Sequence, residues 1–452
     1  MGGLRGTVLM TGFTKQLALL VFLLSAPLAA EAQTVNAASC SSTDVQNAIN
    51  TAVAGGTVSV PPGNCTWSNL VTLSKAITLN GAGAGVTKIT LGSLSPIFQI
   101  TKQTNGVTRI SNITFVAGPN NAVFPFGINV GGPWPNGQPV IFQNDAFVTV
   151  SSDMIGVATP GGVILSHNTF NGTWDTRLIV IKDTGTTSWT TADTMGSRDT
   201  SGWNNIYIED NQFVGGSNGI TDCDDSCRMV VRHNTFGANG QDSGGINSHG
   251  EDSSPQGMRH FEIYNNSFLF PDKSCAAGNS SLSNINQWIW IRGGTGVIFN
   301  NNFDHLQSTC WGTKTEVRLS LRGAEDDRPQ GTCSQVTYPV PHQLGQNHNG
   351  TSSFTDPIRF WGNTGTVISV SGGWTWNNPC GFNWNTFFQW GRDGENASLL
   401  LPILLSLTGG SVSGLGGSPK PGYTAYTYPH PLVQGSSSSN PVAPTNLAAT
   451  VQ

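Results

Sequence analysis

We expect an all-β chain that coils as a parallel β-helix, because one short phrase recurs along the sequence. The phrase alternates like a strand and ends in Asn-x-Phe, and it occurs at residues 206–213, 230–236, 261–268 and 297–303. The terminal phenylalanines are separated by 23, 32 and 35 residues. Repetition at a period of about 20–50 residues is typical of a solenoid, and here the repeated unit is a strand.

The phrase also predicts how successive rungs of the coil are joined. Its alternating Ile, Val and Phe residues should fill the core. Its asparagines should stack at one corner, each bonding its own turn and the amide of the next rung. The four expected ladder residues are Asn211, Asn234, Asn266 and Asn301.

Composition agrees with a coil of many tight turns. Charged residues make up 10% of the chain and Gly contributes 56 of 452 residues, which does not suit helices with solvated charged faces. A solenoid grows by adding rungs, so this length does not require several domains. The net charge of −5 argues against nucleic acid as a partner.

The N-terminus has the features of a secretory signal peptide over residues 1–32. Arg5 and Lys15 precede or flank an apolar run at 17–30, and Ala30-Glu31-Ala32 is a cleavage site. The run is too short for a membrane span. We therefore expect a secreted protein (extracellular or periplasmic) without a membrane span, and a monomer.

Eight cysteines in an exported chain favour disulfides. Cys40 should pair with Cys65, and Cys223 with Cys227. A metal site formed by Cys223, Cys227 and His233 is the disfavoured alternative. The pairing of the remaining four cannot be deduced from sequence: Cys275, Cys310, Cys333 and Cys380.

The first elements after the signal should close one end of the coil. Residues 42–54 predict an amphipathic helix with Ser42 or Thr43 as N-cap and Gly55-Gly56 as its stop, followed by strands at 57–63 and 71–80. These segments, with GGTVSVPPG, KAITLNGAG and TKIT, resemble the N-terminal cap of pectate-lyase-like right-handed parallel β-helices. The resemblance extends over residues 40–400, and that superfamily mostly contains polysaccharide lyases and glycoside hydrolases.

Further copies of the phrase continue the coil at 110–115, 163–170 and 358–364, so we expect a β-helix domain over 33–408. A Gly-, Ser- and Pro-rich linker should follow at 409–440, with an aromatic segment at 422–432 that docks back on the coil. Residues 441–452 resemble the opening strand of a fibronectin type III module, truncated after one strand.

A second strand precedes each Asn-x-Phe strand, and its outward residues differ from rung to rung. The segments are 178–182, 219–223, 245–249, 288–292 and 318–322. If Ile179, Ile220, Ile246, Ile289 and Leu319 point inward, alternation places two columns outward. One column is Lys182, Cys223, His249, Arg292 and Arg322. The other is Val180, Thr221, Asn247, Trp290 and Ser320.

A column of cations in a chain so poor in charge suggests an anionic ligand such as a uronate polymer. In β-elimination a base removes the proton alpha to the carboxylate, and cations stabilise the resulting enolate. The expected catalytic residues are Lys182, His249, Arg292 and Arg322. The expected substrate-binding residues are Asn247, Trp290, Trp311 and Arg259. Asp222, Asp224, Asp225 and Glu251 could hold a Ca²⁺ ion.

Other readings of the same residues stay open. Arg292 and Arg322 could pair with acids on adjacent loops. Arg259 and His260 could line a neighbouring outward face with Glu262, or belong with it to a surface salt-bridge cluster. The order of Thr221-Asp222, Asp224-Asp225, Ser248-His249-Gly250 and Ile291-Arg292 is similar to the motifs of polygalacturonases. That pattern lacks an Asn and a Lys here, and both acidic motifs fall on one rung. The hypotheses are therefore a lyase on an acidic polysaccharide, a glycoside hydrolase, or a non-catalytic adhesive β-helix.

Overall fold

The computed structural model describes the coil from its N-terminal helix to a segment at 419–433, with gaps. The described residues are 2–3, 33–92, 96–118, 127–133, 136–149, 154–159, 161–172, 179–181, 197–215, 221–223, 227–237, 245–248, 258–269, 288–291, 293–304, 317–320, 345–348, 353–356, 358–365, 367–371, 388–389, 411–413 and 419–433.

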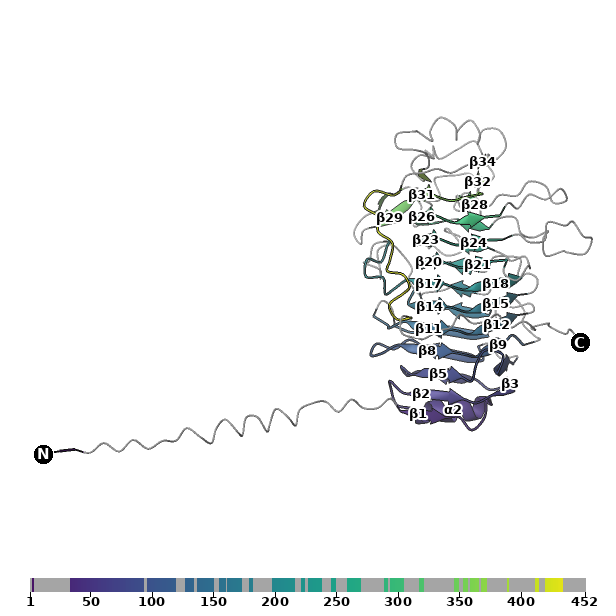
Figure 1. Cartoon of the computed structure of the whole chain (residues 1–452), viewed down its shortest axis with the longest axis vertical. Coiled ribbons are helices and arrows are strands. Elements are labelled where there is room, and N and C mark those ends of the chain that lie inside the picture. Colours follow the sequence, from purple (N-terminus) through teal and green to yellow (C-terminus); the bar gives the residue numbers. More distant parts are fainter. Residues whose placement is uncertain are drawn as a thin grey trace, which may run out of the picture.

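Three long sheets wrap around one core, and successive rungs pair in parallel, as expected of a parallel β-helix (Figure 1). The 12-stranded sheet contains β1 Thr34–Asn36, β2 Thr57–Val60, β5 Thr78–Gly81, β8 Thr108–Ser111, β11 Val140–Gln143, β14 Val163–Ser166, β17 Ile206–Glu209, β20 Arg228–Arg232, β23 His260–Tyr264, β26 Thr295–Phe299, β31 Ile358–Trp361 and β33 Phe388–Gln389.

The 11-stranded sheet contains β4 Val71–Leu73, β7 Phe98–Thr101, β10 Ile128–Gly131, β13 Ile155–Val157, β16 Ile179–Ile181, β19 Thr221–Cys223, β22 Ile246–Ser248, β25 Ile289–Ile291, β28 Val317–Ser320, β32 Val367–Ser371 and β34 Ser411–Ser413. Its last pair, β32 and β34, is antiparallel.

The 9-stranded sheet contains β3 Gly63–Trp67, β6 Thr87–Leu91, β9 Thr114–Val116, β12 Ala146–Thr149, β15 Thr169–Gly172, β18 Gln212–Gly215, β21 Thr235–Phe236, β24 Ser267–Phe268 and β27 Asn302–Phe303. A separate antiparallel pair is formed by β29 Gln346–His348 and β30 Ser353–Thr355. Within the described residues, no helix is long and apolar enough to cross a membrane.

The Asn-x-Phe phrase forms the corner between the 12-stranded and 9-stranded sheets, and the predicted asparagine ladder is confirmed. The backbone N–H of Asn211 donates to Oδ1 of Asn234 (2.9 Å), and that of Asn234 to Oδ1 of Asn266 (3.0 Å). Each amide also donates downward, as from Asn234 Nδ2 to the Ile208 carbonyl (2.8 Å). The full ladder is Asp145, Asn168, Asn211, Asn234, Asn266, Asn301 and Asn363.

The phenylalanines that end the phrase stack through the core. Phe147, Phe170, Phe213, Phe236, Phe268 and Phe303 follow one another with ring centroids 4.6–4.9 Å apart. The residue before each ladder position must turn the chain sharply, so it adopts a left-handed conformation. His167 (φ 57°) and His233 (φ 56°) do so, which assigns both histidines to corner geometry.

Helix α2 (Ser42–Thr51) lies at the N-terminal end of the coil and buries Val45, Ala48 and Ile49 in the core (Figure 1). Its N-cap is Ser41, whose hydroxyl accepts from the N–H of Asp44, so the expected cap at Ser42 or Thr43 is wrong. The expected strand at 71–80 is likewise two strands, β4 and β5, on different sheets.

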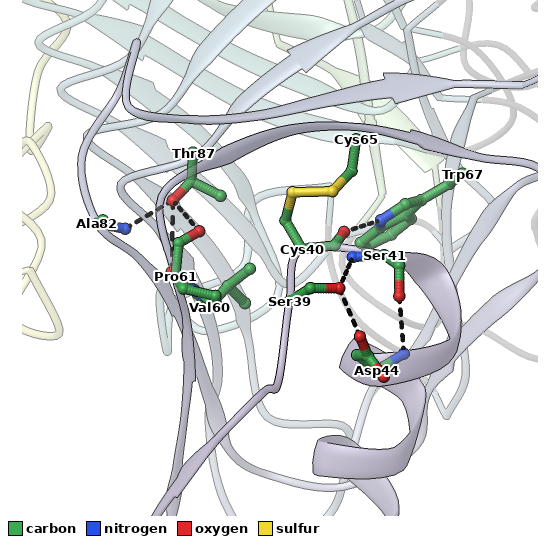
Figure 2. The surroundings of a disulfide bond; sticks show 10 residues. All are labelled: Ser39, Cys40, Ser41, Asp44, Val60, Pro61, Cys65, Trp67, Ala82 and Thr87. Carbon is green, nitrogen blue, oxygen red and sulfur yellow. Dashed lines mark hydrogen bonds between the residues drawn. A yellow bond between two sulfur atoms is a disulfide. The ribbon is translucent and has the colours of Figure 1, made fainter.

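Both predicted disulfides are present, Cys40–Cys65 and Cys223–Cys227. The first joins the entry to α2 to strand β3, and the indole of Trp67 donates to the Cys40 carbonyl beside it at 2.9 Å (Figure 2). The Cys223 and Cys227 side chains are fully buried in the core. The other four cysteines lie outside the described residues.

Residues 419–433, which we call the C-terminal strap, pack on the outer face of the 12-stranded sheet. Figure 1 shows the strap in yellow, running along the coil. Lys420 bonds Asp356 at one end (2.5 Å), and the Leu432 carbonyl accepts from Arg109 at the other (2.7 Å). Between them, the Arg232 guanidinium donates to two strap carbonyls. The strap therefore joins rungs that are far apart along the coil.

Candidate functional site

The outward column of the 11-stranded sheet is the strongest candidate site. Pairing between successive strands places one residue per rung at the same register position. In order along the coil these are Val180, Asp222, Asn247, Trp290 and Arg318. Asn247 and Trp290 are partly exposed, while their strand neighbours Ile246, Ile289 and Ile291 are buried. The strand alternation therefore turns these two predicted substrate-binding residues away from the core.

Hydrogen bonds join the two polar members of the column. Asn247 Nδ2 donates to Asp222 Oδ1 (3.3 Å), and Asp222 is only 3% exposed. Beneath them, the N–H of Asn247 donates to the Thr221 hydroxyl and that hydroxyl donates to the Asn247 carbonyl, both at 3.3 Å. The two side chains are therefore held at fixed height on adjacent rungs, with the Asp222 carboxylate buried and the Asn247 amide partly exposed next to the rung of Trp290.

The column continues toward the N-terminal end with another amide pair. Asn129 Nδ2 donates to Gln99 Oε1 (3.0 Å), and both side chains are partly exposed. The register runs through Gly156 to Val180 and then to Asp222. Amide side chains can donate to and accept from hydroxyl groups, so this face has the chemistry of a surface that binds polyols.

Two parts of the predicted alignment are wrong. Ile179 pairs with Thr221 and not with Ile220, and Ile289 pairs with Val317 and not with Leu319. The first error placed Cys223 outward, whereas it points into the core and bonds Cys227. It also placed Thr221 in the outward column, where Asp222 lies.

The second error has the same origin at the other end of the column. The fully buried Val317 takes the inward position, so Arg318 occupies the register position next to Trp290. The predicted alignment placed Ser320 level with Trp290 and Arg322 level with Arg292. The observed register differs from that alignment by two residues. Val317 and Leu319 are two residues apart, so alternation places both on the same face of the strand. Alternation alone could therefore not show which of them pairs with Ile289.

Several predicted residues lie outside the described part of the chain. These are Lys182, His249, Arg292, Arg322, Trp311, Asp224, Asp225 and Glu251. In sequence, Lys182, His249 and Arg292 each follow a column residue by two positions, namely Val180, Asn247 and Trp290. Their catalytic roles stay predictions. Among the described residues, no three His, Cys, Asp or Glu side chains are grouped to hold a metal ion.

Arg259 directly precedes β23 of the 12-stranded sheet, whereas Asn247 and Trp290 lie on the 11-stranded sheet. It is fully buried, and its backbone bonds Cys227 and Thr295 at the entry to β23, in line with the 12-stranded sheet. The salt-bridge alternative grouped Arg259 and His260 with Glu262. Glu262 does pair with His260 (3.2 Å), and also with Arg198 (2.7 Å), but all three residues of that group are buried and do not lie on the surface.

Glu262 lies at the centre of a buried polar cluster beneath the C-terminal strap. The Tyr423 hydroxyl donates to its second oxygen (2.6 Å). Burial acts to raise the pKa of Glu262, but the bond from His260 and the charge of Arg198 outweigh it and leave that pKa below its usual value. Burial also lowers the pKa of His260, which favours the neutral ring. The strap closes this cluster, so we assign it to packing.

Neither a protein-family model nor a curated protein matches the chain. Solved structures give distant similarities. An alginate lyase from Paenibacillus sp. str. FPU-7 is 13% identical over 75% of this chain and 98% of its own, with a TM-score of 0.35. A PL6 family polysaccharide lyase from Pseudopedobacter saltans is 14% identical over 78% and 81%, with a TM-score of 0.37. The catalytic domain of a GH87 α-1,3-glucanase is 13% identical over 76% and 65%, with a TM-score of 0.28.

Proposed function

We propose that the protein is a secreted carbohydrate-active enzyme that cleaves an acidic, uronate-containing polysaccharide by β-elimination. The observation that carries the proposal is the in-register column Asp222, Asn247 and Trp290 on the outer face of the 11-stranded sheet. Rungs of a coil repeat at about 4.8 Å, which is close to the repeat of an extended sugar chain. A polymer lying along the column would meet one outward side chain on each rung.

The chemistry of the column suits a sugar. The partly exposed amide of Asn247, which bonds the buried carboxylate of Asp222, can bond hydroxyl groups. The partly exposed indole of Trp290 offers a flat apolar face to a sugar ring. The column position next to Trp290 is Arg318, whose guanidinium is suited to a carboxylate. Together these groups favour a polymer that carries both hydroxyl groups and carboxylates.

The proposed reaction needs a base and cations beside this column. The base takes the proton alpha to the uronate carboxylate. The electron pair then forms a carbon–carbon double bond as the bond to the leaving sugar oxygen breaks, and that oxygen takes a proton from water or from a protonated side chain. Lys182, His249, Arg292 and Arg322 are the proposed groups, and they follow the column residues of their own rungs in the sequence. His249 is the one whose ordinary pKa lies nearest neutrality, so we propose it as the base.

A Ca²⁺ ion fits the chemistry of the column without being required by it. Asp222 supplies a carboxylate, an oxygen ligand of the kind Ca²⁺ prefers, while Asn247 on the adjacent rung turns its Nδ2 toward that carboxylate. Asp224, Asp225 and Glu251 are the further proposed ligands. When bound, the ion would neutralise the substrate carboxylate and acidify the adjacent proton.

The experiment that tests the proposal incubates the purified full-length chain with a panel of uronate-containing and neutral polysaccharides. Each reaction is run with Ca²⁺ and with a chelator. Elimination yields an unsaturated sugar that absorbs in the ultraviolet. New reducing ends without that absorbance would overturn elimination and favour the glycoside hydrolase, in which Asp222 would act as one of the paired carboxylates. Neither signal would favour a non-catalytic adhesive protein.

A matched pair of variants connects the activity to the column. Lys182→Ala and His249→Ala should each lower turnover by at least about a hundredfold, since general acid–base groups contribute about 10²–10⁴. Lys88→Ala removes a partly exposed cation from the 9-stranded sheet instead, and it should leave turnover unchanged. Equal losses in the column and control variants would contradict a site on this face.

A further inference from the structure

One member of the corner ladder is an acid where the other described members are asparagines. Asp145 fills the ladder position between rungs: its Oδ1 accepts from the N–H of Ile113 (2.8 Å), and its own N–H donates to Oδ1 of Asn168 (2.9 Å). The side chain is 2% exposed. Oδ1 therefore does what the amide oxygen does on every other rung.

The second oxygen of Asp145 occupies the place of an amide N–H₂ donor. In the next two rungs, Asn168 Nδ2 donates to the Phe142 carbonyl (3.0 Å) and Asn211 Nδ2 donates to the Leu165 carbonyl (2.9 Å). Phe142 pairs with Ile110 one rung below. By this register, the Ile110 carbonyl is the acceptor that a donor at position 145 would meet.

An ionised carboxylate cannot make that bond, because it only accepts. Asp145 Oδ2 is buried and, within the described residues, has no hydrogen-bond partner as a carboxylate. A carboxylate oxygen facing a carbonyl oxygen in the core would be repulsive, and burying it unpaired is costly. A protonated carboxyl resolves both problems, since its O–H replaces the amide N–H.

Two charged or titratable side chains on the flanking rungs, Arg109 and His167, make their bonds elsewhere and do not stabilise an ionised Asp145 carboxylate. On the rung below, Arg109 points outward to Gln143 and the Leu432 carbonyl. On the rung above, His167 bonds the Ser166 hydroxyl. Burial raises the pKa of Asp145 well above its usual range, and the backbone N–H groups of Ile113 and Gln143 act against that shift without reversing it.

We propose that Asp145 is a neutral carboxylic acid in the folded protein and that its O–H donates a hydrogen bond to the Ile110 carbonyl. This acid makes the N-terminal half of the coil sensitive to pH. The folded pKa is above the unfolded one, so this contribution to stability is complete below the unfolded value. It is lost as pH rises toward and through the folded value. The ladder thus contains one rung that weakens when the medium becomes alkaline.

The test compares Asp145→Asn with the parent full-length chain by chemical denaturation at a series of pH values from about 4 to 9. An asparagine supplies both the acceptor and the donor at any pH. Near pH 4 the two unfolding constants should agree within a few-fold. Above that, the parent should unfold more readily by about tenfold for each pH unit, until the folded pKa is reached.

The reciprocal variant Asn168→Asp is the matched control, because it places an acid in the same environment one rung higher. It should acquire the pH dependence that Asp145→Asn loses. A pH-independent ratio between parent and Asp145→Asn, or a parent that is the more stable at alkaline pH, would overturn the proposal. Failure of Asp145→Asn to fold would also overturn it, since the amide should satisfy both bonds.

Discussion

The outer faces of two sheets of the same coil differ in how far their outward residues are buried. On the 12-stranded sheet, the C-terminal strap buries the outward ion pair of Glu209 and Arg232, both with fully buried side chains. On the 11-stranded sheet, the outward residues Asn247 and Trp290 stay partly exposed. The two faces follow the same strand alternation, so the alternation itself does not identify a functional face. What distinguishes them is that the strap buries the outward ion pair of one face, while Asn247 and Trp290 on the other stay partly exposed.

The largest effect should come from breaking the covered face. Arg232→Met leaves Glu209 as an unpaired buried charge, which typically costs about 3–5 kcal/mol. Urea denaturation followed by tryptophan fluorescence would measure it. Arg359→Met is the control, because Arg359 is a partly exposed cation on the same sheet and its loss should change stability by less than about 0.5 kcal/mol. Similar costs for both variants would show that the strap does not create a special environment.

A smaller loss is expected at the corner that both faces share. Asn234→Ala removes the acceptor of the Asn211 N–H and the donor to the Ile208 carbonyl. Each group left unsatisfied in the core costs about 1–3 kcal/mol. Asn265→Gly alters an exposed, left-handed corner residue (φ 54°) that precedes the next ladder residue, Asn266, and it should be nearly neutral. A stable Asn234→Ala chain would mean that the ladder contributes little beyond the sheets.

The strap should also respond to acid. Burial lowers the pKa of His430 to about 4, and its Nδ1 accepts from the N–H of Leu432. Because the folded pKa is depressed, this contribution is present above the unfolded value and is lost as pH falls through about 4. His430→Gln should reduce the acid-induced loss of stability by at most about 1.4 kcal/mol per pH unit. His167→Gln, outside the strap, should not reproduce the change.

The smallest effect is expected on the exposed face, and it should appear in function without a change in stability. Trp290→Ala would remove roughly 50 Å² of apolar contact with a sugar ring, worth about 1.3 kcal/mol, or about tenfold in KM. Trp290→Phe should retain part of the binding. Denaturation midpoints of all three proteins should coincide. A large loss of stability in Trp290→Ala would assign the indole to packing instead.

The sequence predicted the parts of the molecule that repeat. The Asn-x-Phe phrase located the ladder and the phenylalanine stack, because those residues contact their own equivalents one rung away. The disulfide between Cys223 and Cys227 was predictable for a different reason, because the two residues are only four positions apart in the sequence. The outward column was located only approximately. Its register depends on which residues pair between neighbouring strands. Thr221 and Val317 pair with Ile179 and Ile289, whereas the alignment by alternation had placed Ile220 and Leu319 there.

The polar cluster beneath the strap could not be found from sequence at all. Glu262 and Tyr423 are separated by 161 residues, and no spacing rule connects them. An aromatic segment inside a Gly-, Ser- and Pro-rich stretch was the only available signal. It indicated docking on the coil without identifying the acceptor. Residues that contact each other at only one place in the fold produce no repeating pattern in the sequence.

The strap changes how such a coil can assemble. Rungs of a solenoid contact only their neighbours, so a coil can form progressively from either end. The bond from Arg109 to the Leu432 carbonyl spans 323 residues, and the Lys420–Asp356 pair lies many rungs away from it. The strap can dock fully only after every rung between these points has formed at its correct height. It therefore acts as a check on the length of the finished coil, in which a missing or slipped rung leaves one anchor without its partner.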